Sequence, residues 1–464
     1  MLGISKSLIE HWNSDSVRYC HWKSNEHLME GLQGETDLDI FVYPEDKDKA
    51  EKNLNELQFI KFKQQSYCTY PKVEEWIGFD YDTGKLIHVH LHYQIITGTK
   101  FNKEYVFPVD DLIVETRILH QETGVYTTSY ELELILLYCR IVLKSRDKKR
   151  IKPSCDYNKE IDYLKERYSK DTLQNLLIRL LSDDALKVFD YIEKEKLSYN
   201  EWYDLFVILS NWLKPFKSKS QIHVFLRYNY YKILNRIVKT LNSRYESLFI
   251  TKKRMPERGI SICFIGVDGS GKSTVSKDIS KWLSWKLENH AFYLGSGDGY
   301  KRHRGFLSRI ATKLQHPAAN LLRIAHYYMH QLRRSEKYIN KGGIALFDRF
   351  PQVQFYGIYD GPKITTQFAS KMNQKNVRRL AQKEEKIIKD CQRYQPDILF
   401  KLVIPVEESI RRKHDNEKII RKKVEITENL NFEHSETHVI DATQDYDKEL
   451  IGIKRIIWQR MLRN

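Results

Sequence analysis

Hydrophobic and polar positions change their spacing along the chain, and these changes divide it into three regions. Up to about residue 125, short β-like runs separated by Gly, Asp and Pro turns flank a segment with helical spacing. The runs cover residues 38–43 and 86–93, and the helical segment covers residues 45–59. This pattern predicts a small α/β domain over residues 1–125.

The next region has helical spacing throughout. Apolar residues recur at helical intervals, almost without an intervening glycine, over residues 130–144, 172–181 and 201–213. Residues 251–259 (TKKRMPERG) then have the composition of a linker, and a strand–loop–helix pattern follows. We therefore expect a helical domain with its linker over residues 126–255 and a second α/β domain over residues 256–464.

Composition supports folded domains and narrows the choice of partners. The 464 residues are 41 % hydrophobic and 30 % charged, which excludes a disordered or collagen-like chain. Lys and Arg number 77 against 61 Asp and Glu, a net charge of +16. A surplus of this size favours polyanionic partners: nucleotides, phosphorylated metabolites, nucleic acid or an acidic membrane surface. The charge alone does not choose among them.

Targeting and redox features indicate a soluble protein of the cell interior. No stretch approaches about 18 uninterrupted apolar residues, so we expect no membrane span. The first residues, MLGISKSLIEHWNSDS, lack the basic start and apolar core of a signal peptide. The six cysteines form no CxxC pair, which indicates reduced thiols. These features predict a cytoplasmic location.

The strongest motif follows a predicted buried strand at residues 260–267. The sequence GVDGSGKST matches GxxxxGK[ST], and a helical pattern begins directly after it. Glycines let backbone N–H groups turn inward around a phosphate, and the helix N-terminus adds partial positive charge. We expect this loop to bind ATP through Gly266, Asp268, Gly269, Ser270, Gly271, Lys272, Ser273 and Thr274. Lys272 can reach the β- and γ-phosphates, and Ser273 can ligate Mg²⁺.

Other polar residues of this domain follow predicted strands. Asp348 and Arg349 end the strand GGIALFD, where a carboxylate can hold Mg²⁺ through water and an arginine can clamp a second phosphate. Basic residues surround the stretch HDNEK, and such residues can neutralise the charge that spreads over transferring phosphoryl oxygens. They are Arg411, Arg412, Lys413, Arg421, Lys422 and Lys423.

Taken together, residues 260–464 resemble the thymidylate kinase family of P-loop kinases. The matching pieces are GVDGSGKST, the strand-end DRF, the strand PDILFKL with its basic lid, and VIDAT. The resemblance implies transfer of the ATP γ-phosphoryl group to a nucleoside monophosphate, with Lys272 and Ser273 holding ATP–Mg²⁺. It also implies that Asp268 faces an acceptor hydroxyl and that Arg349 holds the acceptor phosphate. Lid arginines such as Arg412 and Arg421 then act in the transition state.

Two departures from the family pattern leave the acceptor open. The family's base-contacting Ala-Asn-Arg stretch falls near Ala325-His326-Tyr327-Tyr328, where the arginine is absent although Arg323 lies nearby. The loop Gly295–Gly299, followed by Lys301, Arg302 and Arg304, also differs, and its glycines and cations could cradle an anionic acceptor. The acceptor is therefore a dTMP-like monophosphate or another small molecule with a phosphate or hydroxyl group.

The first domain carries a second candidate site. Asp37 and Asp39 lie at i and i+2 on a predicted strand, so both project from one face and can share divalent ions. This DxD resembles the polymerase-beta-like nucleotidyltransferases, which implies a nucleotidyltransferase-like α/β fold. Trp22-Lys23-Ser24-Asn25 replaces the family's usual Gly-Ser pair.

Histidines stand where that family has its third acidic residue. His88, His90 and His92 alternate along the strand LIHVHLHY. The candidate metal ligands are Asp37, Asp39 and His90, because neutral imidazole can ligate a metal. The alternatives are a nucleophilic histidine and a purely structural fold whose histidines bond across the sheet.

Three functional hypotheses remain. The first is a bifunctional enzyme that phosphorylates a metabolite or sugar and adds a nucleotidyl group to a related compound. The second is a nucleoside monophosphate kinase with an inert first domain. The third is a nucleic-acid-linked ATPase, which the absence of a nucleic-acid-binding module disfavours. A peripheral membrane contact through residues 318–334 is a minor alternative, and a homodimer remains open.

Overall fold

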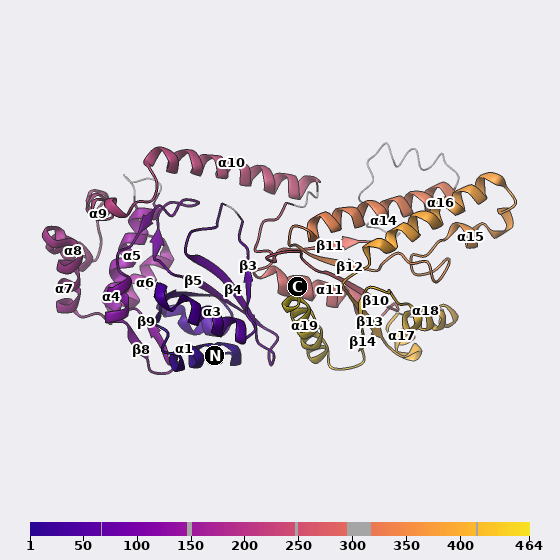
Figure 1. Ribbon diagram of the computed structural model, residues 1–464, viewed down its shortest axis with the longest axis horizontal. Coiled ribbons are helices and arrows are strands. Elements are labelled where there is room, and N and C mark those ends of the chain that lie inside the picture. Colours follow the sequence, from indigo (N-terminus) through magenta and orange to yellow (C-terminus); the bar gives the residue numbers. More distant parts are fainter. Residues whose placement is uncertain (66, 146–150, 246–248, 295–316, 414–415) are drawn as a thin grey trace. The chain divides into compact units, whose positions relative to one another are not determined.

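The computed structural model describes residues 1–65, 67–145, 151–245, 249–294, 317–413 and 416–464. The chain forms two compact units, Met1–Phe249 and Ile250–Asn464. Figure 1 shows the helices and strands of each unit. The border between the units falls just before the linker-like segment 251–259. Met255 within that segment is buried, and its N–H donates to Gly342 O of the second unit at 2.9 Å.

A mixed sheet forms the centre of the first unit. Its strand order is β3-β4-β5-β2-β1-β9-β8, and the pairs β2–β5 and β1–β9 are parallel while the others are antiparallel. The strands are β1 (Tyr19–His21), β2 (Asp37–Val42), β3 (Ile60–Phe62), β4 (Val73–Phe79), β5 (Leu86–His92), β8 (Ile118–His120) and β9 (Val125–Thr127). A short hairpin pairs β6 (Ile96–Thr97) with β7 (Tyr105–Val106).

Each face of this sheet has its own apolar core. On one face, the sheet packs with Leu8, Trp12 and Leu54 of the helices α1 and α3. On the other, Phe41 and Trp22 join a core built mainly by helices of the region 130–213. The helices of the unit are α1 (Gly3–Ser14), α2 (Leu28–Leu32), α3 (Lys47–Glu56), α4 (Asp110–Thr116), α5 (Tyr130–Lys144), α6 (Cys155–Lys165), α7 (Lys170–Leu181), α8 (Ala185–Glu193), α9 (Tyr199–Trp212) and α10 (Gln221–Tyr245).

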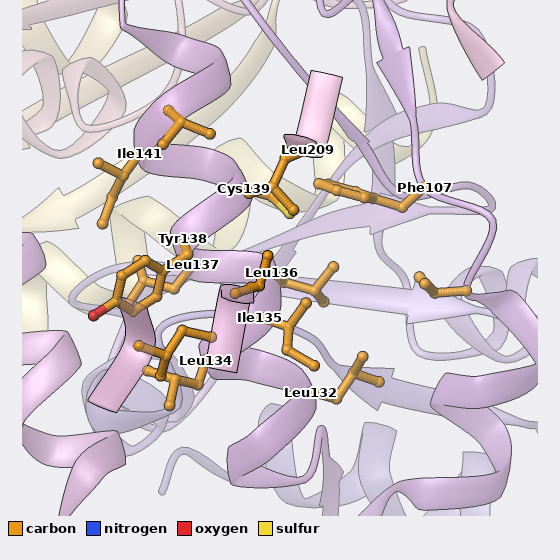
Figure 2. Packing of buried hydrophobic residues seen from close by; sticks show 14 of the residues in the cluster. Phe107, Leu132, Leu134, Ile135, Leu136, Leu137, Tyr138, Cys139, Ile141 and Leu209 are labelled. Atoms are coloured by element: carbon orange, nitrogen blue, oxygen red, sulfur yellow. The ribbon is translucent and has the colours of Figure 1, made fainter. Parts of the chain in front are cut away.

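Helix α5 is the centre of the second core. All its residues from Glu131 to Leu143 are buried, because the run ELILLYCRIVL is apolar on nearly every side and needs cover all round. Figure 2 shows its side chains packing with Phe107 and with Leu209 of α9. Ser129 begins the helix as an N-cap that accepts from Leu132 N–H. The helical spacing over residues 130–144 is therefore confirmed.

The second unit contains a parallel sheet in the order β11-β12-β10-β13-β14. Its strands are β10 (Ser261–Gly266), β11 (Asn289–Tyr293), β12 (Ile344–Asp348), β13 (Ile398–Val403) and β14 (Glu436–Asp441). After β10 the chain first forms β11 and β12 on one side of it, and later forms β13 and β14 on the other side. The carboxyl end of β10 is therefore a topological switch point, where ligands bind in open α/β sheets.

Helices connect these parallel strands. They are α11 (Lys272–Ser284), α14 (Pro317–Ile339), α15 (Ile364–Gln367), α16 (Lys375–Cys391), α17 (Val406–Lys413), α18 (Glu417–Asn429) and α19 (Tyr446–Leu462). The mixed α/β class predicted from the sequence is confirmed for both units, and the second is consistent with a P-loop kinase-like fold. The nucleotidyltransferase-like fold of the first unit stays a prediction, as do the domain borders at 125/126 and 255/256.

No helix of the described residues is both long and apolar enough to cross a bilayer.

Candidate functional sites

The phosphate-binding motif lies between β10 and α11. Every residue of β10 is buried, so the strand fixes the start of the loop. Gly269 and Gly271 both have φ of +86°, a conformation that side-chain-bearing residues rarely adopt. Gly271 is the N-cap of α11, and Lys272 begins the helix. The sequence therefore places a glycine-lined loop against a helix N-terminus, an arrangement suited to anions.

Lys272 is buried at the base of this loop. Its Nζ donates to Val267 O at 2.7 Å, and only 9 % of the residue is exposed. Burial lowers the pKa of the Lys272 ammonium to about 8. A phosphate group placed in the loop would stabilise the charged form, so this lysine gains more from an anion than an exposed lysine does.

Asp348 and Ser273 lie where a divalent ion could be held beside the loop. Asp348 ends β12 and pairs in register with Phe264 of β10, which brings it to the switch point. Its Oδ1 is buried and has no hydrogen-bond partner among the described residues. Ser273 is exposed in the first turn of α11. A buried carboxylate oxygen without a partner and an exposed hydroxyl are oxygen donors of the kind that Mg²⁺ prefers.

A cavity lies next to the loop. Its lining residues are Ile265, Gly266, Asp268, Lys272, Arg349, Phe350, Ile358, Tyr359, Lys423 and Leu430. Polar groups stand at its loop end, and apolar side chains complete the wall. Such a cavity suits a small molecule with a charged group and a flatter, less polar body.

Arg349 lines this cavity and is paired with the buried carboxylate of Asp360. Arg349 Nη1 lies 4.0 Å from Asp360 Oδ2, and Tyr328 donates to Asp360 Oδ1 at 2.9 Å. Burial alone would lower the pKa of Arg349, but Asp360 and neighbouring carboxylates raise it. Arg349, Tyr359 and Asp360 all have positive φ. This backbone strain is a cost that the surrounding structure has to offset, and such strain concentrates at functional sites.

The basic lid residues have different surroundings. Lys423 of α18 forms an ion pair with Asp268 of the loop, and this pair holds the pKa of Asp268 below its usual value although burial alone would raise it. Arg412 of α17 donates to Gly269 O at 3.1 Å. Arg421 instead pairs with Glu417 on its own helix at 2.6 Å and remains exposed. In this conformation the loop is contacted by Lys423 and Arg412.

Of the two segments that depart from the family pattern, the structure describes one. The glycine-rich loop Gly295–Gly299 with Lys301, Arg302 and Arg304 lies outside the described residues. In the aligned base-contacting stretch, Ala325 is buried and Tyr328 bonds to Asp360. This stretch therefore contacts Asp360, the residue that pairs with Arg349.

The first unit gathers a second group of polar side chains on one sheet face. Parallel pairing sets Asp37 opposite His88 and Asp39 opposite His90, while antiparallel pairing sets Glu75 of β4 opposite His90. Since side chains alternate along strands, the carboxylates and histidines at these positions share a face. The DxD pair and the histidine strand are thus brought together, and Glu75 supplies a third carboxylate.

Two hydrogen-bonded groups divide this face. His88 binds Asp37 Oδ1 and Glu75 Oε2, each at 2.6 Å. Asp39 Oδ1 lies 2.9 Å from His90 Nδ1 and 2.9 Å from Lys23 Nζ. Burial alone would raise the pKa of Asp39, but Lys23 and the histidines hold it well below its usual range. Burial lowers the pKa of the neighbouring His92 to about 3, so that ring is neutral.

A basic pocket opens beside His90 and His92. It is lined by Trp22, Lys23, Tyr70, Val73, His90, His92, Ile96, Thr97, Lys103, Arg140 and Lys144. Burial together with neighbouring cations lowers the pKa of Lys103 to about 8 and that of Lys144 to about 6. Arg140 pairs with Glu160 at 2.9 Å, whereas Lys103 and Lys144 form no ion pair with a described residue. An anion in the pocket would favour the charged forms of both lysines.

Sequence reasoning missed several of these residues. Glu75 lies on a strand that carries no motif, and its position in the site depends on the register of β4 against β5. Asp360 and Tyr359 lie in an irregular segment with no motif. Lys103 follows the hairpin strand β6, and Arg140 and Lys144 belong to a helix that looks purely structural. Lys423 was among the basic residues named from the sequence, and its place three residues after buried Ile420 and four before buried Thr427 indicates which face of α18 it occupies.

Comparisons with known proteins find relatives that match part of this chain. No family model matches the chain. The chain is 27 % identical over 212 residues to the ATP-binding protein YghR of Escherichia coli (strain K12), covering 41 % of this chain and 83 % of that protein. It is 24 % identical over 221 residues to the ATP-binding protein YghS of the same strain, covering 42 % and 91 % respectively.

Solved structures are similar as well. The thymidylate kinase of Candida albicans shares 17 % identity and aligns with 45 % of this chain and 96 % of its own, at a TM-score of 0.29. That score is too low to support an inference, so the topology of the second unit rests on its own strand order.

Proposed function

We propose that the second unit is an ATP-dependent phosphotransferase that acts on a small acceptor. One observation carries the proposal. The loop with Lys272 lies at the carboxyl end of β10, directly beside a cavity that contains Arg349 and Asp268. Donor and acceptor sites are therefore adjacent, as direct transfer between two bound molecules requires. The names of YghR and YghS as ATP-binding proteins support the donor.

On the donor side, the loop amides and Lys272 would hold the phosphates of ATP. Ser273 and Asp348 would hold Mg²⁺, which when bound neutralises charge on the β- and γ-phosphates. Arg412 already contacts Gly269 O and is close enough to the loop to stabilise charge that develops on the transferring group. Lys272 would share that task from the buried side of the loop.

On the acceptor side, Arg349 would hold an anionic group. The acceptor oxygen forms a bond to the γ-phosphorus while the bond between that phosphorus and the ADP oxygen breaks. If the acceptor is an alcohol, Asp268 is placed to take its proton; if the acceptor is a phosphate, no proton needs to leave. Phe350, Ile358 and Tyr359 would contact the remainder of the molecule. A nucleoside monophosphate and a phosphorylated sugar both fit this description, and the dTMP-like monophosphate is the first candidate.

The test is ATP turnover with Mg²⁺ against a panel of acceptors, followed by separation of the nucleotide products. The panel contains dTMP, other nucleoside monophosphates, sugars, sugar phosphates and single-stranded DNA. Saturable ADP formation with a small acceptor, together with a phosphorylated product, supports the proposal. Stimulation by DNA alone would replace it with the nucleic-acid-linked ATPase. ADP formation that no acceptor changes would also contradict it.

For the first unit we propose nucleotidyl transfer as a second candidate function. The specific observation is the shared face of Asp37, Asp39 and Glu75, three carboxylates on the two strands that flank β5. Release of pyrophosphate from a nucleoside triphosphate should depend on these residues. The double substitution Asp37→Asn with Asp39→Asn should abolish pyrophosphate release, whereas Asp48→Asn, at an exposed position of α3, should not. Equal release by both variants would contradict the candidate.

A further inference from the structure

Three side chains of the first unit direct donor atoms at one point. They are Asp39 Oδ1 on β2 and His90 Nδ1 and His92 Nε2 on β5. The distances between these atoms are 2.9 Å from Asp39 to His90, 3.3 Å from His90 to His92 and 3.6 Å from His92 to Asp39. The three atoms therefore form a compact triangle.

The size of this triangle matches a tetrahedral metal site. Zn²⁺ binds imidazole nitrogen and carboxylate oxygen at about 2.0–2.2 Å, so neighbouring ligand atoms of a tetrahedron are about 3.3–3.6 Å apart. Two of the three edges fall in that range, and the third needs to lengthen by about 0.4 Å. An ion above the triangle could reach all three atoms with small side-chain movements.

The donor set also discriminates between metals. Two imidazole nitrogens and one carboxylate oxygen suit transition-metal ions such as Zn²⁺, whereas Mg²⁺ prefers oxygen ligands. Three protein ligands leave a fourth position for water or another molecule, as in catalytic zinc sites. Asp37 is outside the triangle, because its carboxylate is held by His88.

A second layer of residues orients these ligands. His90 Nε2, the nitrogen that does not face the triangle, lies 3.4 Å from Glu75 Oε1. Glu75 is fixed in turn by His88 at 2.6 Å and by Gln64 Nε2 at 2.8 Å. A carboxylate behind a metal-binding histidine fixes the ring orientation and makes the ligand more basic. The structure contains this support for His90.

We propose that Asp39, His90 and His92 bind a divalent transition-metal ion whose open position takes an anionic ligand from the basic pocket. His90 and His92 line that pocket together with Lys103 and Lys144. These lysines form no ion pair with a described residue, and an anion on the metal would supply one. Lys23 contacts Asp39 at 2.9 Å, and metal binding displaces it from that oxygen. The inference does not rest on either of the two proposed functions.

The first test is Co²⁺ titration of the full chain, followed by displacement with Zn²⁺. Tetrahedral Co²⁺ gives intense visible absorption that octahedral Co²⁺ lacks, so the spectrum reports the geometry directly. We expect one equivalent with the tetrahedral spectrum. His90→Gln and His92→Ala should each weaken Zn²⁺ affinity at least 100-fold, because each removes one of three ligands. His120→Ala, which removes a histidine of β8 bonded to Thr123, should leave the affinity unchanged.

Two further variants separate a metal site from a structural histidine cluster. Glu75→Gln should weaken Zn²⁺ binding about 10- to 100-fold through the orientation of His90. Lys23→Met should tighten it several-fold, because the competing ammonium is gone. A merely structural cluster predicts no gain from Lys23→Met. His92 is buried, so the unfolding temperature of its variant is measured as well; His90→Gln, at a half-buried position, keeps the test decisive if the first variant does not fold.

The anion is tested with inorganic pyrophosphate added to the Co²⁺ form. We expect a spectral change that saturates, and a weaker response in the double variant Lys103→Met with Lys144→Met. An octahedral Co²⁺ spectrum, or the same Zn²⁺ affinity in His90→Gln and the unmodified chain, would overturn the metal site. A tetrahedral site without any pyrophosphate response would overturn the anion part alone.

Discussion

The two candidate sites differ in how their polar groups are satisfied. In the second unit, Asp348 Oδ1 and Ser270 Oγ are buried without a hydrogen-bond partner in the part of the chain that the structure describes. In the first unit, Asp37 is bonded to His88, and Asp39 is bonded to His90 and Lys23. The carboxylates of the DxD pair therefore already have protein partners, whereas Asp348 Oδ1 and Ser270 Oγ of the second site are left for another molecule to satisfy.

This difference predicts different responses to mutation. Buried polar atoms without partners are costly, so a ligand that pairs with them recovers that cost, and a preformed loop needs little rearrangement to bind it. In the first unit a ligand has to replace a protein contact such as Lys23–Asp39. Single residues of the loop should therefore have large effects, while the first site should show competition between the protein's own groups and the ligand.

The largest effect is expected for Lys272→Ala. Loss of the buried ammonium at the phosphate loop should lower kcat/KM for ATP by about 10²–10³-fold, because a preorganised charge at the reacting phosphates is removed. Steady-state ADP formation measures this. Lys281→Ala, which changes an exposed lysine of the same helix, should retain turnover within about twofold of the unmodified chain. Comparable turnover in the two variants would contradict the role of the loop.

Arg349→Ala should have the next largest effect and separates acceptor from donor. Removal of the guanidinium should raise KM for the acceptor by about 30-fold, since a charge-assisted hydrogen bond contributes about 2 kcal/mol. KM for ATP should change much less. Full kinetics with both substrates varied distinguish the two constants, with Arg378→Ala on α16 as the exposed control. Equal changes in both KM values would place Arg349 outside the acceptor site.

The pH dependence of ATP binding should show a smaller, graded effect. Burial lowers the pKa of Lys272 to about 8, and bound phosphate stabilises the protonated form. Below pH 8 the lysine is already charged, so affinity is at its full value there. Above pH 8 the free protein has to take up a proton to bind, and Kd should rise by up to about tenfold per pH unit. Titrations from pH 7 to pH 9.5 test this, and Lys272→Met should remove the slope.

The same comparison explains how much of each site could be predicted from the sequence. The loop from Gly266 to Thr274 is one continuous segment between a strand and a helix, so local rules predicted its position. Asp348 was predictable as well, because it directly ends an apolar strand. The first site depends on register: Glu75 faces His90 only because β4 pairs with β5 as it does, and no local pattern states that pairing.

Other residues escaped prediction because tertiary packing brings them in. Asp360 belongs to an irregular segment where Tyr359 and Asp360 both have positive φ, a conformation that propensity rules do not anticipate for these residues. Lys103 and Lys144 meet at the basic pocket although 41 positions separate them, and only the packing of α5 on the sheet brings them together. Charge counts predicted anionic partners but could not place these cations.

The smallest expected effect on turnover distinguishes Lys423 from Arg421, two basic residues of α18. Packing of Ile420 and Thr427 against the unit turns Lys423 toward Asp268, and Arg421 lies about 160° away from Lys423 around α18, where it pairs with Glu417. Lys423→Ala should therefore lower turnover about five- to tenfold, because Asp268 loses its partner and the transferring group loses a nearby charge. Arg421→Ala should change turnover less than about twofold, as expected for an exposed ion pair within one helix. The resemblance to thymidylate kinases implies instead that Arg421 acts in the transition state. A larger loss for Arg421→Ala than for Lys423→Ala in kcat would mean that α18 rotates or shifts when both substrates are bound.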